Sequence, residues 1–166
     1  SLDILGNVIP FIANEEEKME RELNKIMGVY SGGRFEPAPF TLTANCARVP
    51  VAEGHLESLM FELEVEPTLD EMARTLSGFR GEPQRLELPS APSDPVIVRS
   101  EPDRPQPVFD LMAGSPERAR GMAVTVGRLR KSNGLYKAFV FSHNTLRGGA
   151  GGSVLNAELA YRTGLL

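Results

Sequence analysis

The chain has 166 residues, of which 41% are hydrophobic and 24% are charged, and its formal net charge is −4. These values are typical of one ordinary globular domain with a sizeable core. The lack of a basic block argues against a nucleic acid partner, and the apolar runs are too short to cross a bilayer. A single cysteine precludes an internal disulfide and is typical of a reducing compartment. We therefore expect a cytoplasmic protein that binds neither nucleic acid nor membrane.

The first third of the chain predicts one helix between two irregular segments. Residues 1–13 are apolar and are expected to form an extended or irregular segment. Asn14 is a suitable N-cap with Glu17 as its capping-box partner, and Gly28 ends the apolar periodicity of the helix. Residues 30–39 are rich in glycine and proline and read as a loop.

Two strands and a second helix follow. Residues 40–51 and 55–65 are typical of strands, and the short link between them predicts an antiparallel pair. Thr68 and Glu71 form a capping box that opens the helix. Residues 82–107 are proline-rich and predict a long loop around one short strand at Val96–Arg99.

The last third predicts a β-hairpin and a final helix. Residues 122–129 and 136–141 are strand-like and flank a turn at 132–134. A helix is expected over 154–163, after a flexible run of glycines and with Ser153 as its cap. The order of elements predicts a single α+β domain over 1–166, with a mixed, mostly antiparallel sheet and helices packed on one face.

The chemically richest segment places a cysteine, an arginine and a histidine within ten residues: Cys46, Arg48 and His55. An arginine binds a carboxylate through two parallel hydrogen bonds, and a histidine transfers protons near neutral pH. Each residue also has an ordinary structural interpretation. Cys46 in a strand is more often a small buried hydrophobe, and a single arginine or histidine is usually a surface or structural group. His143 is expected to be structural.

Five segments together resemble the aspartate-semialdehyde dehydrogenases, in their archaeal and fungal branch. The Cys46-x-Arg48 and His55-x-Glu57 pairs are similar to the family's signature. Segments 7–12, 15–20, 103–107 and 142–153 resemble other family segments, in the family's order. The resemblance implies the catalytic and dimerisation half of such an enzyme, with a fold like the C-terminal domain of glyceraldehyde-3-phosphate dehydrogenase.

The resemblance also implies roles for matching residues. His55 matches the acid/base histidine, and Arg48 matches the arginine that binds the substrate carboxylate. Glu15 matches the acidic group that meets the substrate amino group, and Lys18 matches a lysine on the phosphate side. We expect these four residues to line one cleft. Asn144 and Gly149 match the nicotinamide side of an NADP site, and no metal site is expected.

Two parts of the family's machinery have no match in these 166 residues. The nucleophilic cysteine belongs to an Asn-Cys-Ser/Thr motif, whereas Ala47 follows Cys46, which matches a second, non-nucleophilic cysteine. The Rossmann half with its Gly-x-Gly-x-x-Gly motif, which holds most of the NADP, is also unmatched. We therefore expect the isolated chain to be inactive.

The resemblance implies that the complete enzyme interconverts aspartyl phosphate and aspartate semialdehyde, in amino-acid biosynthesis, as a homodimer or tetramer. A cysteine thiolate forms a thioester, hydride reduces it, and His55 supplies a proton as the intermediate collapses. Two alternatives stay open. One is part of a dicarboxylic acyl-CoA reductase such as a malonyl-CoA reductase, which Glu15 would distinguish. The other is a non-catalytic, self-associating structural domain.

Overall fold

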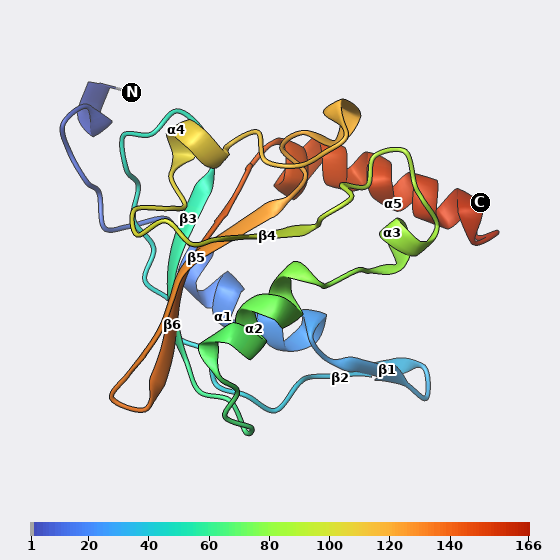
Figure 1. Ribbon diagram of the computed structural model, residues 1–166, viewed down its shortest axis with the longest axis horizontal. Coiled ribbons are helices and arrows are strands. Elements are labelled where there is room, and N and C mark those ends of the chain that lie inside the picture. The colour runs from blue at the N-terminus through green and yellow to red at the C-terminus, as the bar shows by residue number, and fades with distance from the viewer. Residues whose placement is uncertain (1) are drawn as a thin grey trace. The chain divides into compact units, whose positions relative to one another are not determined.

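The computed structural model describes residues 2–166, without the side chain of Leu2. The chain divides into two compact units, Ser1–Val51 and Ala52–Leu166. The first unit holds a 3-10 turn at Leu2–Ile4, helix α1 (Glu15–Ile26) and strands β1 (Val29–Ser31) and β2 (Arg34–Glu36). The second unit holds a four-stranded sheet and the remaining helices (Figure 1).

A small hairpin replaces the loop predicted over residues 30–39. Strands β1 and β2 pair antiparallel around Gly32 and Gly33, both of which have positive φ. The rings of Tyr30 and Phe35, which face each other across this pair, lie 5.1 Å apart between centroids. Cross-strand aromatic contacts of this kind favour a hairpin that strand propensity alone does not indicate.

Helix α1 forms as predicted, but its capping box does not. Asn14 adopts a left-handed conformation with φ 61°, and its side chain caps no backbone N–H. The Asn14–Glu17 capping box predicted from the sequence is therefore wrong. Three glutamates in the first turn still place negative charge at the positive end of the helix dipole.

The strand predicted over residues 40–51 is also wrong, because acidic side chains of α1 take the place of a neighbouring strand. Glu16 accepts a hydrogen bond from the Cys46 N–H at 2.7 Å, and Glu20 accepts one from the Ala44 N–H at 3.0 Å. A single antiparallel bridge between Ile9 and Arg48 is the only ladder contact described for this segment. The backbone is extended, but its donors are satisfied by carboxylates.

The sheet of the second unit has the order β3-β6-β5-β4. Its strands are β3 (His55–Phe61), β4 (Val96–Arg99), β5 (Val124–Ser132) and β6 (Leu135–Ser142). The pairs β3–β6 and β5–β6 are antiparallel and β4–β5 is parallel, which confirms the mixed, mostly antiparallel sheet. β5 and β6 form the predicted hairpin. The predicted partner of β3 is wrong, since β3 pairs with β6 instead of with residues 40–51.

Four helices accompany the sheet: α2 (Leu69–Ser77), α3 (Glu82–Arg85), α4 (Pro107–Asp110) and α5 (Gly151–Arg162). The Thr68–Glu71 capping box of α2 is present as predicted, and α2 packs against β4 and β5. The short α3 lies inside the segment predicted as a loop. No helix of the described chain is long and apolar enough to cross a membrane.

Helix α5 begins in the glycine run that was expected to be flexible. Ser153 is therefore not the cap; it lies inside the helix, where its hydroxyl donates to the Gly149 carbonyl at 3.2 Å. A side chain at Gly151 would place its Cβ 2.5 Å from the sulfur of Met122. The glycine thus permits close packing of α5 on the core cluster. That cluster contains Leu88, Ala91, Ala119, Met122 and Leu155.

One buried carboxylate fixes the segment that links β4 to α4. Asp110 is 2% exposed, and it accepts hydrogen bonds from Arg99 Nε (3.1 Å), Arg104 Nε (2.7 Å) and the Gln106 N–H (2.7 Å). Burial by itself raises the pKa of the Asp110 carboxyl. The hydrogen bonds from Arg104 and Gln106, with the charges of both arginines, outweigh burial and hold that pKa below its ordinary value.

We predict that Asp110→Asn lowers the free energy of unfolding by about 3 kcal/mol at pH 7, because two partly exposed guanidinium groups lose the buried carboxylate that balances their charge. A carboxylate with a depressed pKa stabilises the fold above its unfolded pKa of about 3.9, and that stabilisation is lost as the pH falls through the folded pKa. The difference in free energy of unfolding between wild type and variant should therefore shrink in acid.

Urea unfolding of both chains between neutral and acid pH measures this difference. Asp94→Asn removes an exposed ion pair with Arg80 and is the control, with at most about 1 kcal/mol expected. An equal loss in both variants would contradict the prediction.

Candidate functional site

Glu15 and Lys18 lie together in the first turn of α1. Lys18 Nζ is 4.0 Å from Glu15 Oε1, and the two side chains are 52% and 35% exposed. Spacing of three residues puts both groups on one edge of the helix, next to its positive end. The pair is loose and open to solvent, so both charged groups are available to a ligand with an ammonium and an anionic end.

Arg48 is fixed through its backbone and exposed through its side chain. Its N–H donates to the Ile9 carbonyl (2.9 Å), and its carbonyl accepts from the Ile9 N–H (3.1 Å). No acidic side chain within residues 2–51 forms a salt bridge with the guanidinium. A fixed backbone with an uncompensated guanidinium is well suited to bind a carboxylate.

Cys46, two residues earlier, is half-buried against α1. Its thiol donates to the sulfur of Met19 at 3.6 Å, and its N–H is held by Glu16. This packing is typical of a small hydrophobic residue, and it supports the structural interpretation of Cys46 over that of a nucleophile.

His55 is the first residue of β3, and Gly54, directly before it, marks the start of the strand. Gly54 has φ +100°, and a Cβ at that position would lie 2.3 Å from the ring of Phe141. Only glycine permits this approach. His55 pairs with Ser142, the last residue of β6, and its side chain is exposed at that end of the sheet.

Asn144 lies at the same end of the sheet, two residues beyond Ser142, and is exposed. The turn that carries it is held by His143, whose Nδ1 accepts from the N–H groups of Thr145 (3.2 Å) and Leu146 (3.3 Å). The expected structural role of His143 is confirmed. Gly149 follows in a π-helical turn, Leu146–Ala150, with non-helical angles of φ −135° and ψ −109°.

The sequence analysis missed the contact that joins these two segments. Glu53 Oε2 accepts a hydrogen bond from Thr145 Oγ1 at 3.1 Å. In the sequence, the only indication of this contact is a charged residue, Glu53, directly before Gly54 and His55. Its partner lies far along the chain, so no local pattern reveals it.

The predicted site residues thus fall into two groups. Glu15, Lys18 and Arg48 belong to the first unit, and His55, Asn144 and Gly149 belong to the second. Within the second unit, His55 and Asn144 both lie at one end of the β3–β6 ladder. That all of the residues line one cleft stays a prediction.

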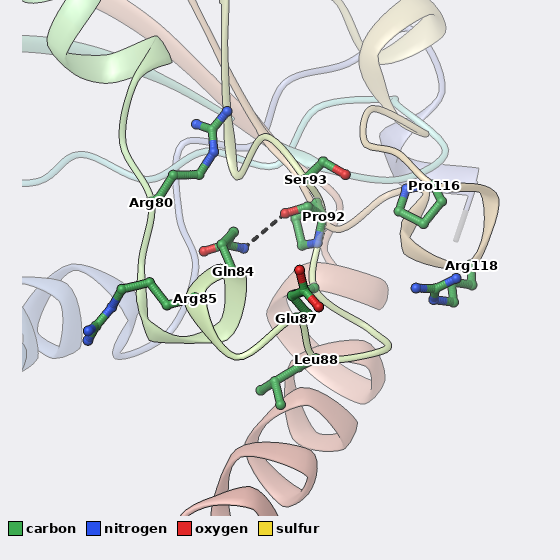
Figure 2. A pocket seen from close by; sticks show the side chains of 10 residues that line it. Arg80, Gln84, Arg85, Glu87, Leu88, Pro92, Ser93, Pro116 and Arg118 are labelled. Carbon is green, nitrogen blue, oxygen red and sulfur yellow. Dashed lines mark hydrogen bonds between the residues drawn. The ribbon is translucent and has the colours of Figure 1, made fainter.

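A pocket of about 480 Å³ elsewhere in the second unit contains none of the predicted residues. Figure 2 shows the Gln84 side chain directed at the Pro92 carbonyl, with Arg85 and Arg118 at opposite sides of the view. The arginines are engaged by the protein itself: Arg80 by Asp94, Arg85 by Glu82, and Arg118 by the Pro89 carbonyl. The pocket therefore offers little uncompensated charge to a ligand.

The fold and the arginine–histidine motif are those of a semialdehyde dehydrogenase domain. Residues 1–147 match the family described as "Semialdehyde dehydrogenase, dimerisation domain", and the chain belongs to that family.

Similar proteins carry more specific names. The chain is 47% identical over 163 residues to the aspartate-semialdehyde dehydrogenase of Methanothermobacter thermautotrophicus, covering 96% of this chain and 45% of that protein. It is 37% identical to the NADP malonyl CoA reductase of Metallosphaera sedula, covering 100% of this chain and 46% of that protein. The Candida albicans aspartate-semialdehyde dehydrogenase, solved with NADP, superposes with a TM-score of 0.86 at 35% identity, over 99% of this chain and 47% of that one. The chain spans about half the length of these relatives.

We predict that Gly54→Ala lowers the free energy of unfolding by at least about 2 kcal/mol, because a methyl group there meets the Phe141 ring and φ is unfavourable. Gly134→Ala is the matched control, since Gly134 has φ +80° but open space around it. The control should cost about 1 kcal/mol from the backbone alone. Urea denaturation of the two variants compares them, and equal losses would show that the ring contact is unimportant.

Proposed function

We propose that this chain is the substrate-binding and dimerisation part of an NADP-dependent dehydrogenase that interconverts aspartyl phosphate and aspartate semialdehyde. The observation that carries the proposal is the Cys46-x-Arg48 and His55-x-Glu57 motif in a chain 47% identical to a named aspartate-semialdehyde dehydrogenase. The exposure of Arg48 and His55 supports it, because both side chains are accessible to a small molecule.

The first unit supplies the groups that bind the charged ends of the substrate. Arg48 binds the carboxylate through its planar guanidinium. Glu15 pairs with the amino group, and Lys18 binds the phosphate, in the first turn of a helix whose dipole favours an anion. Fixing both ends of the substrate places the acyl carbon for attack.

His55 transfers the proton. As the tetrahedral intermediate collapses to the aldehyde, a proton must leave its oxygen, and one must return to the released thiolate. An imidazole side chain transfers protons readily near neutral pH. The attacking thiol belongs to a part of the complete protein outside these 166 residues, because Cys46 is packed against Met19.

Asn144 and the adjacent glycines fit the nicotinamide side of NADP, which supplies or accepts the hydride when bound. A Cβ at Gly148 or Gly149 would meet nothing closer than 3.7 Å, so packing within the chain does not require glycine there. A residue without a side chain at an exposed turn is suited to close approach of a ligand. Most of the cofactor is held by the nucleotide-binding part of the complete protein. The chain alone is therefore expected to be inactive.

Malonyl-CoA reduction is the second candidate, supported by the 37% identity to the Metallosphaera sedula enzyme. The two substrates differ at one place: aspartyl phosphate has an amino group where a malonyl thioester has none. Glu15, which is paired loosely with Lys18, favours the first candidate because its carboxylate complements an ammonium group.

We predict that, in the complete protein, His55→Ala lowers kcat at least about a hundredfold with little change in KM, as expected for loss of a general acid–base. Arg48→Ala should instead raise KM for aspartate semialdehyde at least about tenfold, as expected for loss of a charged hydrogen bond. Steady-state kinetics with NADP and phosphate distinguishes the two effects. Arg85→Ala, which removes a 70% exposed arginine outside the proposed site, serves as the control for loss of positive charge. Equal, small effects of both site variants would refute these roles.

We also propose that the chain self-associates, as a homodimer or tetramer, through the sheet of the second unit. β3 lies at an edge of the sheet, and Leu56 and Met60, on one side of it, are 47% and 67% exposed. Exposed apolar residues on an edge strand require a cover, and the family is described as a dimerisation domain.

We predict that Met60→Asp weakens this association at least about tenfold, because an interface must then bury a charge. Val65→Asp, at a site 77% exposed and outside β3, is the control and should leave it unchanged. Light scattering over a concentration series measures the dissociation constant. A wild-type chain that stays monomeric at high micromolar concentration would contradict the proposal.

A further inference from the structure

Glu53 joins the start of β3 to the turn that follows β6. Its Oε2 accepts a hydrogen bond from Thr145 Oγ1 at 3.1 Å. Glu53 stands two residues before His55, and Thr145 directly follows Asn144. A single side-chain contact therefore links the segment that carries the proposed proton-transfer group to the turn that carries the proposed nicotinamide contact.

Both ends of this contact are held in place independently. On one side, Gly54 packs closely against the Phe141 ring. On the other side, the Thr145 N–H donates to His143 Nδ1, and His143 is itself 9% exposed. The Glu53–Thr145 hydrogen bond connects these two points, so its loss removes a side-chain contact that ties the turn around Asn144 to the start of β3.

The second carboxylate oxygen of Glu53 indicates that stability is not the reason for this residue. Oε1 is buried and has no hydrogen-bond donor among residues 2–166. A buried acceptor without a donor is destabilising, and such groups in native proteins call for an explanation in function.

We propose that Glu53 is a positioning residue, which holds Asn144 at a fixed distance from His55 through Thr145 so that the nicotinamide end of NADP binds in register with the proton-transfer site. The inference rests on the proposed function, since Asn144 is given its cofactor role there. It does not require Glu53 to touch the substrate or the cofactor. The turn that carries Asn144 contacts the nicotinamide, and Glu53 fixes the position of that turn.

The experiment uses the complete protein and pairs variants that remove the hydrogen bond with variants that keep it. Glu53→Ala and Thr145→Val remove it. Glu53→Gln keeps an acceptor oxygen, and Thr145→Ser keeps the hydroxyl. Glu66→Gln, which neutralises an exposed carboxylate paired with Lys131, is the control for loss of charge.

The two readouts are the dissociation constant of NADP, from calorimetry without substrate, and the thermal midpoint. Glu53→Ala and Thr145→Val should each weaken NADP binding about tenfold, with KM for aspartate semialdehyde within about twofold. The double variant should be no weaker than either single one, because the two residues make one contact. Glu53→Gln, Thr145→Ser and the control should bind NADP as the wild type does. The thermal midpoint of Glu53→Ala should be unchanged or raised.

Three results would overturn the inference. The first is a lower thermal midpoint with unchanged NADP affinity, which indicates a structural role only. The second is additive effects of Glu53→Ala and Thr145→Val, which indicates two separate functions. The third is equal weakening by Glu53→Gln and Glu53→Ala, which assigns the effect to charge. If Glu53→Ala does not fold, the inference is tested by comparing the NADP dissociation constants of Thr145→Val and Thr145→Ser. Absence of any NADP-dependent turnover in the wild type would instead refute the proposed function.

Discussion

The antiparallel ladder between β3 and β6 is the interaction on which the rest of the second unit depends. It pairs His55 with Ser142, and so joins the first strand of this unit to the last. Closing a loop of this length costs conformational entropy, which the contacts between the two strands offset. Seven residue pairs of β3 with β6 supply them. Once the ladder forms, Glu53 and Thr145 are adjacent at its end, although Glu53 precedes β3 and Thr145 follows β6.

In the first unit, helix α1 supplies the hydrogen-bond acceptors that a neighbouring strand was expected to supply to residues 40–51. Residues 40–51 have the composition of a strand, but Glu16 and Glu20 of α1 accept hydrogen bonds from the Cys46 and Ala44 N–H groups. A carboxylate on a helix satisfies a backbone donor as well as a strand carbonyl does, and it leaves the extended segment free to carry an exposed side chain at every second position. Arg48 lies in this segment with an exposed side chain, while its backbone forms the bridge with Ile9.

Most local signals were read correctly, with the Asn14–Glu17 capping box as an exception. The Thr68–Glu71 capping box, the Asn133-Gly134 turn and the short strand Val96–Arg99 all involve residues within a few positions of each other. Two further errors arose where distant residues decide. The partner of β3 depends on a strand near the other end of the chain, and the early start of α5 depends on contact with Met122. The same division applies to the site: motif residues were named one by one, whereas the Glu53–Thr145 contact is invisible to any local pattern.

The buried Asp110 cluster restricts how this segment can change over evolutionary time. Arg99 and Arg104 share one carboxylate that has almost no access to water. A stepwise route to an apolar version must pass through a protein with an unpaired buried charge, and that intermediate is less stable than either end point. The three positions are therefore epistatic. Sequences of this family should either keep the acidic residue with both arginines or lack the set as a whole, and partial combinations should be rare.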